Sequence, residues 1–80
     1  IIMKNKVINL IAETLDVDKA KLNEKTNLVE DLDVESLDLV DLVGAFEEEF
    51  GVVIQDKDIK GLQTVGDIVN YIEEHQEKDA

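Results

Sequence analysis

Apolar residues recur at the spacing of an α-helix in three separate stretches of this chain. A first amphipathic helix is predicted from about Asn5 to Asp16, where the apolar stripe is Val7, Leu10, Ile11 and Leu15. A second is predicted from Ser36 to Phe50, and it ends at Gly51 because glycine readily takes the left-handed conformation that terminates helices. The last begins at a Thr-x-x-Asp capping pattern at Thr64 and has the buried stripe Val65, Ile68, Val69 and Ile72.

Two connections join these helices. The first, over residues 16–34, has no helical period, and loops of that length in compact domains tend to be ordered and functional. We expect four apolar residues to pin it to the core: Leu22, Leu28, Val29 and Leu32. The second carries Val-Val-Ile at residues 52–54, which we interpret as an extended, packed connector because the chain offers no partner strand. A short helical turn over residues 56–60 follows and stops at Gly61.

These elements predict an all-α fold, a small four-helix bundle with three longer helices, one short third helix and a long ordered loop between helices one and two. No internal repeat or domain boundary interrupts the 80 residues, so we expect one domain over residues 1–80. Ile1 and Ile2 precede Met3, and we expect Met3 to be the natural start and the two isoleucines to take no part in the fold. Residues 76–80 are expected to form a flexible tail.

The second helix has two apolar sides when its residues are placed on a wheel at about 100° per residue. One arc is the predicted core face, made of Leu39, Leu42, Val43, Phe46 and Phe50. Leu37 and Gly44 lie opposite, with Val40 on the shoulder, inside an acidic frame of Asp38, Asp41, Glu47 and Glu48. Single exposed apolar residues are ordinary. The combination instead predicts a docking surface, because charge steers a basic partner and the small apolar centre supplies contact area.

The charge distribution supports that interpretation. With 8 basic and 20 acidic residues the net charge is −12, which repels nucleic acid and anionic lipid and favours a basic partner. No basic residue lies between Lys25 and Lys57. A charge run is commonly a solvated face, but clustering of one sign costs self-repulsion and therefore favours a functional use.

The chain contains no cysteine, which excludes disulfides, thiolate metal sites and a thiol nucleophile of its own. No apolar run is long enough to span a membrane. We therefore expect a cytoplasmic protein.

Ser36 stands at the entrance to the second helix. Its position alone favours an N-cap, for which serine is among the best residues. The alternative is covalent attachment, because a phosphate ester there would lie near the free backbone N–H groups and the positive end of the helix dipole. The acidic neighbours Glu35 and Asp38 oppose an anion, so the local field leaves both interpretations open.

Other chemistries for this segment fail on residue type. A serine hydrolase is excluded because Ser36 lacks a Gly-x-Ser-x-Gly elbow and the only histidine, His75, lies in a charged segment where a solvated side chain is far commoner than a base. The acids of residues 31–35 mimic the first ligands of a calcium-binding loop, but Ser36 and Leu42 occupy the positions that need Gly and Glu. A nucleotide-binding glycine loop is absent. The sequence predicts neither a catalytic residue nor a metal site.

The segments L-D-V-E-S-L-D at 32–38 and L-V-D-L-V-G-A-F-E-E-E-F-G at 39–51 resemble the acyl carrier proteins of fatty acid synthesis. In that family a prosthetic serine in a D-S-L motif opens an acidic helix that ends in E-E-E-F or a close variant. The likeness extends to N-L-V-E-D-L at 27–32, to I-Q-D at 54–56, where the family usually has I-P-D, and to T-V-G-D-I-V-N-Y-I at 64–72. S-L-D alone would be weak evidence, whereas this ordered set covers nearly the whole chain.

The resemblance implies a non-catalytic carrier in which Ser36 bears 4′-phosphopantetheine from coenzyme A, and the thiol of that arm holds acyl groups as thioesters. The core face of the second helix would shelter the acyl chain in a cavity between helices. The implied partners are a phosphopantetheinyl transferase and acyl-processing enzymes with basic docking patches. They would bind a monomer with no membrane span through Glu35, Leu37, Asp38, Val40, Asp41, Gly44, Glu47 and Glu48.

Three positions depart from the family pattern. Glu35 replaces the usual Asp before the serine, Asp33 stands where Gly is common, and Gly44 replaces a Met or another apolar residue. Glu35 lengthens the reach of the charge toward the transferase, and Gly44 should weaken apolar contact with some partners.

Two alternatives remain. One is a carrier of polyketide or aminoacyl cargo, although the G-G-x-S motif common in peptidyl carriers is missing. The other is an unmodified acidic adaptor in which Ser36 only caps the helix. Ser36→Ala separates them, because an adaptor keeps its function while a carrier loses it.

Overall fold

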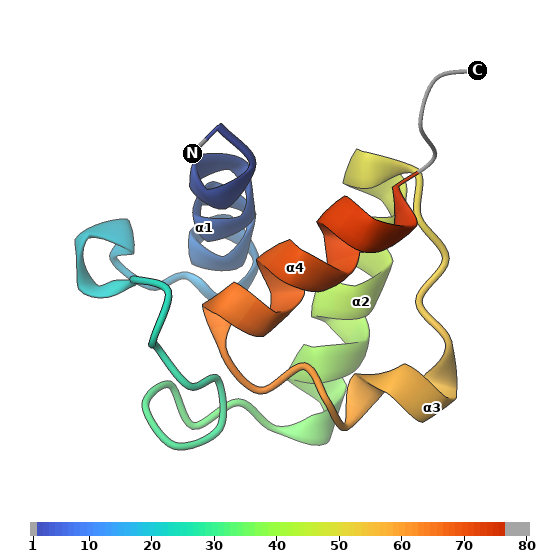
Figure 1. Cartoon of the computed structure of the whole chain (residues 1–80). Coiled ribbons are helices and arrows are strands. Elements are labelled where there is room, and N and C mark those ends of the chain that lie inside the picture. The colour runs from blue at the N-terminus through green and yellow to red at the C-terminus, as the bar shows by residue number, and fades with distance from the viewer. Residues whose placement is uncertain (1, 77–80) are drawn as a thin grey trace.

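The computed structural model describes residues 2–76 and confirms the all-α fold (Figure 1). Its helices are α1 (Ile2–Leu15), α2 (Ser36–Phe50), α3 (Asp56–Ile59) and α4 (Val65–His75), and a 3₁₀ turn, η1 (Lys19–Lys21), lies in the long loop. Over the described residues no strand forms, and a single isolated bridge joins Asn27 to Thr64. Gln76 is the C-cap of α4, and the rest of the expected tail, like Ile1, lies outside the described residues.

The start of α1 differs from the prediction. We expected the helix from about Asn5, with Ile2 outside the fold, but Ile2 is already helical. Met3 and Lys4 are good helix formers, so nothing in the local sequence prevents the helix from beginning at Ile2. Ile2 is 72% exposed while Met3 packs against the core, so the extra turn adds little burial at its first residue.

The core forms where α1 packs against both α2 and α4. On α2 the predicted face is confirmed, since Leu42, Phe46 and Phe50 are buried and Leu39 and Val43 are half-buried against them. The rings of Phe46 and Phe50 stack with centroids 6.3 Å apart, as residues four apart on one helix face can. The largest fully buried side chains from all elements are Phe46, Ile11, Leu28, Leu42, Ile72, Val7 and Val65.

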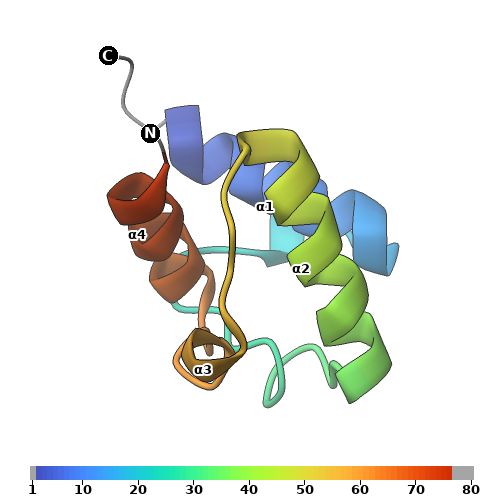
Figure 2. The same cartoon turned by 90° about the vertical axis from the view of Figure 1, so that its right-hand side faces the viewer.

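The connector of residues 52–55 is extended and packed, as predicted. Val52 and Ile54 are buried whereas Val53 is 75% exposed, which is the two-residue alternation of an extended chain. The Ile54 N–H donates to Oε2 of Glu47 at 2.9 Å, so the connector is tied back to α2. Figure 2 shows it descending between α4 and α2 to reach α3.

The long loop is ordered, but one of its predicted anchors is wrong. Leu22 and Leu28 are buried and Leu32 is half-buried, as expected, while Val29 is 60% exposed. Val34 is buried, although the pattern had not placed it in the core.

A tight turn explains the exposure of Val29. The Asn27 side chain accepts the N–H groups of Val29 and Glu30 at 3.0 and 2.9 Å, and Oδ2 of Asp31 accepts the Asn27 N–H at 2.7 Å. Asn and Asp commonly build such local turns. The turn directs Leu28 inward and Val29 outward.

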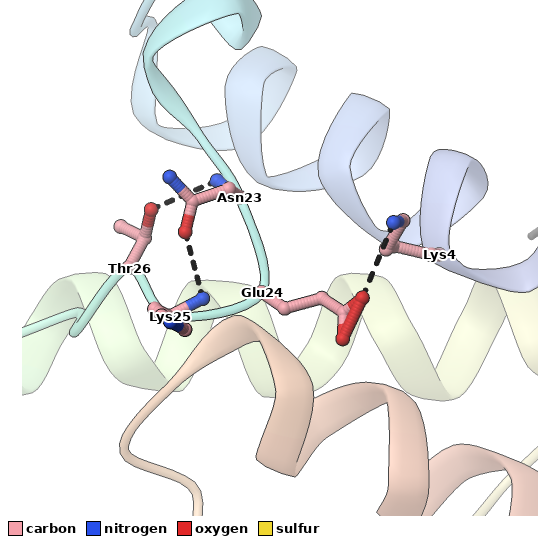
Figure 3. A network of polar contacts seen from close by, with 5 residues as sticks. All are labelled: Lys4, Asn23, Glu24, Lys25 and Thr26. Carbon is pink, nitrogen blue, oxygen red and sulfur yellow. Dashed lines mark hydrogen bonds and ion pairs between the residues drawn. The ribbon is translucent and has the colours of Figure 1, made fainter.

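Polar contacts around residues 23–26 attach the loop to α1 (Figure 3). Oγ1 of Thr26 accepts the Asn23 N–H at 2.9 Å, and Oδ1 of Asn23 accepts the Lys25 N–H at 2.8 Å. Lys4 Nζ lies 3.2 Å from Oε1 of Glu24 in an exposed ion pair. Exposed pairs contribute little stability, so the turn within the loop is the more important restraint.

The same loop helps to cap α4. Its capping box is confirmed, since Oγ1 of Thr64 accepts the Asp67 N–H and Oδ2 of Asp67 accepts the Thr64 N–H, both at 3.1 Å. The carbonyls of Glu24 and Thr26 accept the first two N–H groups of the helix at 2.9 and 3.0 Å. The start of α4 is therefore anchored on the loop that leads to α2.

Candidate functional site

Ser36 is the first residue of α2, and Glu35, not Ser36, is the N-cap. The interpretation of Ser36 as a cap is therefore wrong. Glu35 has the extended conformation of a cap (φ −98°, ψ 171°), and its N–H donates to Oδ2 of Asp38 at 3.1 Å. Ser36 is exposed and its side chain takes no part in these capping contacts, so its side chain is accessible from solvent.

The position of Ser36 suits a covalently attached anion. The first N–H groups of a helix have no partner within it, and with the helix dipole they favour a phosphate near the N-terminus. Asp38 and Glu35 oppose an anion by their charge, although one Asp38 oxygen already accepts the Glu35 N–H.

Two backbone hydrogen bonds close the turn that precedes Ser36. The Asp33 N–H donates to the Val29 carbonyl and the Val34 N–H donates to the Leu28 carbonyl, both at 3.1 Å. Asp33 itself has φ of 59°, in the left-handed region. Asp tolerates that region better than most residues, and Gly tolerates it best. Glycine would therefore fit this turn with less backbone strain than aspartate.

The residues predicted to bind partners gather on the outward side of α2. Leu37, Asp41, Gly44 and Glu48 follow one another at spacings of four, three and four residues and so form one line along the helix. Leu37 is 72% and Val40 is 65% exposed. We call this surface the docking face; it comprises Leu37, Asp38, Val40, Asp41, Gly44, Glu47 and Glu48, with Glu35 beside its first turn.

Two acids of the docking face also have structural contacts that the sequence did not reveal. Asp38 and Glu47 are half-buried, and they accept the N–H groups of Glu35 and Ile54 respectively. The remaining acids, Asp41 and Glu48, are exposed. The last turn of α2 carries no basic residue, and its acids oppose the helix dipole, so helix stability does not account for them.

A groove of about 500 Å³ opens beside the N-terminal half of α2. It is mainly apolar and is lined by Asn27, Leu28, Val29, Glu30, Leu39, Ile59, Lys60, Leu62 and Gln63. Leu39 is three residues from Ser36, a rise of about 4.5 Å along the helix. The groove meets the predicted core face of α2 at Leu39, and the outward turn of Val29 places that side chain in its wall.

On another side of α3, the Tyr71 hydroxyl donates to Oδ2 of Asp58 at 2.7 Å. Desolvation, and after it the hydrogen bond to Asp58, raise the pKa of Tyr71, so the hydroxyl keeps its proton and its donor role at neutral pH. The Tyr71 ring stacks on His75 with centroids 3.9 Å apart. His75 is exposed, and its Nδ1 lies 2.9 Å from the Tyr71 carbonyl. No sequence pattern had pointed to these contacts.

Over residues 2–76, acidic, histidine and cysteine side chains do not gather in threes where they could hold a metal ion. Within the same span, none of the helices has the length and apolar character needed to cross a membrane.

Comparison with known proteins gives one family and several close relatives. Residues 5–72 match the family described as "Phosphopantetheine attachment site". A protein of Thermotoga maritima named "Acyl carrier protein" is 52% identical over 69 residues, which cover 86% of this chain and 85% of that one. Proteins of the same name from Lactobacillus acidophilus (46% over 72 residues, 90% of each chain) and Clostridium perfringens (42% over 76 residues, 95% of this chain and 100% of that one) are also similar.

Proposed function

The chain belongs to the phosphopantetheine attachment family, and on that premise we propose that Ser36 is its attachment residue and the point from which it carries acyl groups for fatty acid synthesis. A carrier of this kind catalyses no reaction itself. The observation that carries the assignment is the exposed hydroxyl at the first position of α2, inside the matched residues. Ser36 is also the only serine in the chain.

Attachment needs only a nucleophilic hydroxyl from this chain. Oγ of Ser36 forms a phosphodiester with the phosphate next to pantetheine, the phosphoanhydride bond of coenzyme A breaks, 3′,5′-ADP leaves, and the hydroxyl proton passes to a base of the transferase. The bound arm supplies a thiol, which a chain without cysteine lacks. Tethering also keeps the acyl group at high effective concentration for each partner enzyme.

The groove beside Ser36 is the proposed shelter for the acyl chain. Its volume of about 500 Å³ lies within the range of about 300–1,000 Å³ typical of small-molecule sites. Each methylene that enters it contributes about 0.8 kcal/mol. The balance between groove and solvent therefore depends on chain length, and short acyl groups gain little from entering.

The docking face is the proposed surface for the transferase and the acyl-processing enzymes. Its acids steer partners with basic patches, and Leu37 and Val40 supply apolar contact near the centre. We propose that a single monomeric domain over residues 1–80 presents this face. The adaptor alternative has lost its main support, because Glu35 occupies the cap position that it assigned to Ser36.

Intact mass after incubation with coenzyme A and a broad-specificity phosphopantetheinyl transferase tests the assignment. We expect the wild-type protein to gain one phosphopantetheinyl group and Ser36→Ala to gain none. Thr14→Ala, which removes a hydroxyl from α1, is the matched control and should be modified like the wild type. Modification of Ser36→Ala, or an unmodified but folded wild-type protein, would refute the assignment.

A further inference from the structure

The position of α3 depends on few contacts. It has four residues, and it is not among the closely packed helix pairs, which join α1 to α2 and to α4. A helix this short has little stability of its own. Individual contacts on its sides therefore decide where it lies.

One side of α3 faces the groove and another is bonded to α4. Ile59 and the following Leu62 line the groove together with Leu39. Asp58 accepts the hydrogen bond of the Tyr71 hydroxyl at 2.7 Å. Successive helical residues point about 100° apart, so the side chains of Asp58 and Ile59 lie on different sides of α3.

Tyr71 links α3 to a helix that is firmly anchored. Its neighbours on α4, Ile68 and Ile72, are 2% and 0% exposed. The connector leads directly into α3 (Figure 2), and the backbone of Gln55, its last residue, lies near enough to the Tyr71 hydroxyl to influence it. The hydroxyl thus sits where the connector, α3 and α4 meet.

We propose that Tyr71 is a positioning residue for the acyl groove: its hydrogen bond to Asp58 holds α3 against α4, keeps Ile59 in the groove wall, and so sets how well each length of acyl chain is sheltered. This rests on the proposed function, because it takes the groove as the place of the acyl chain. Without the bond, α3 moves away from the groove more often. Chains long enough to reach Ile59 then lose protection, whereas an acetyl group, which does not reach the wall, is unaffected.

The test compares loaded wild-type protein with Tyr71→Phe, which removes only the hydroxyl and keeps the ring that stacks on His75. Both proteins are loaded at Ser36 with acetyl, butyryl, hexanoyl and octanoyl groups. Cleavage of each thioester by hydroxylamine is timed against the same acyl group on free pantetheine. In the wild type, cleavage should slow as the chain lengthens. In Tyr71→Phe the octanoyl thioester should be cleaved roughly two- to tenfold faster than in the wild type, the range expected for loss of one hydrogen bond, while the acetyl thioester is cleaved at the wild-type rate.

Matched variants separate this bond from general effects. Asp58→Ala should reproduce the Tyr71→Phe rates, and the double variant should add nothing further, because both changes remove one interaction. Glu73→Gln removes a carboxylate charge from α4 at an exposed position, about 200° around the helix from Tyr71, and should behave as the wild type.

A second measurement does not depend on loading. The N–H groups of Gly61 and Leu62 donate to the carbonyls of Asp58 and Ile59 at 3.0 Å. In unmodified Tyr71→Phe their hydrogen exchange should speed up by roughly two- to tenfold, while exchange at Ile11 in α1 stays unchanged.

The outcomes are distinct. Equal cleavage and exchange rates in Tyr71→Phe and wild type overturn the role of Tyr71 and leave the carrier function intact. Faster cleavage of all thioesters, acetyl included, also overturns it, because it reports general loosening. If the wild-type protein slows the cleavage of none of the thioesters, the groove does not shelter the acyl chain and this inference is overturned. If the protein cannot be loaded at Ser36, the proposed function itself is overturned.

Discussion

Gly44 and Gly66 both lie in helices, but the structure leaves room for a side chain at only one of them. A Cβ atom built on Gly44 has no atom within 4 Å. At Gly66 the Cβ would lie 3.2 Å from the Glu24 carbonyl oxygen, which accepts the N–H of the same Gly66 at 2.9 Å. Alanine should therefore stabilise the protein at Gly44 but not at Gly66.

For Gly44→Ala the gain is the helix propensity, about 0.5–1 kcal/mol in the free energy of unfolding. In a domain of this size each kcal/mol raises Tm by about 4–8 °C, so Tm should rise by roughly 2–8 °C. For Gly66→Ala the same gain is offset, because the carbonyl must move and weaken a hydrogen bond worth about 1 kcal/mol. We expect no net stabilisation there, or a small loss.

Thermal and urea unfolding followed by far-UV circular dichroism measure both variants against the wild type. The reasoning is refuted if Gly44→Ala leaves Tm unchanged at an unaltered m-value, or if Gly66→Ala stabilises as much as Gly44→Ala. A stabilised Gly44→Ala protein would also show that the wild type gives up stability at this position of the docking face.

Two further predictions concern single contacts of the site. Glu47→Ala should lower the free energy of unfolding by about 1 kcal/mol, because the N–H of the buried Ile54 loses its acceptor. Glu47→Gln keeps a carbonyl oxygen that can accept, so urea unfolding should show less than half of that loss; equal losses would contradict the contact. Asp33→Ala should lower the free energy of unfolding by about 1 kcal/mol, because alanine suits the left-handed φ of 59° poorly. Asp33→Gly should be at least as stable as the wild type. An alanine variant as stable as the glycine variant would show that backbone strain is unimportant at this position.

The helix ends were predictable because their signals are local. Gly51 has φ of 65°, and its N–H donates to the Glu47 carbonyl at 3.0 Å, as a glycine terminator should. Thr64 and Asp67 form the box that their spacing indicated. In each case one or two residues a few positions apart determine the geometry.

The start of α2 shows the limit of residue preference. Serine is a better cap than glutamate in general, so Ser36 was a natural candidate. The acid that completes the cap is Asp38, which lies three residues after Glu35 and only two after Ser36. A capping box needs the spacing of three, so this spacing was the signal in the sequence that identified Glu35 and left Ser36 free.

The groove and the hydrogen bond between Tyr71 and Asp58 could not be predicted from any local sequence pattern. Tyr71 and Asp58 are thirteen residues apart and lie in different helices, so no periodicity relates them. Val29 looked like a core anchor because it is apolar, but the turn built by Asn27 and Asp31 sends it into the groove wall. These features arise only when distant segments are packed together.

The geometry of α2 fits the two roles proposed for its surfaces, the groove as the shelter of the acyl chain and the docking face as the surface that binds partner enzymes. Leu37 on the docking face and Leu39 in the groove wall are two residues apart, which is about 200° around the helix. The two surfaces therefore lie on nearly opposite sides of α2, and Ser36 stands at the end where both begin. An arm attached halfway along one side of α2 would lie close to one surface only, whereas an arm on the first residue would start at the end that both surfaces share. If the proposed roles of the two surfaces hold, a partner would occupy the docking face while the acyl chain is still in the groove, and delivery would require only that the chain leave the groove for the partner's site.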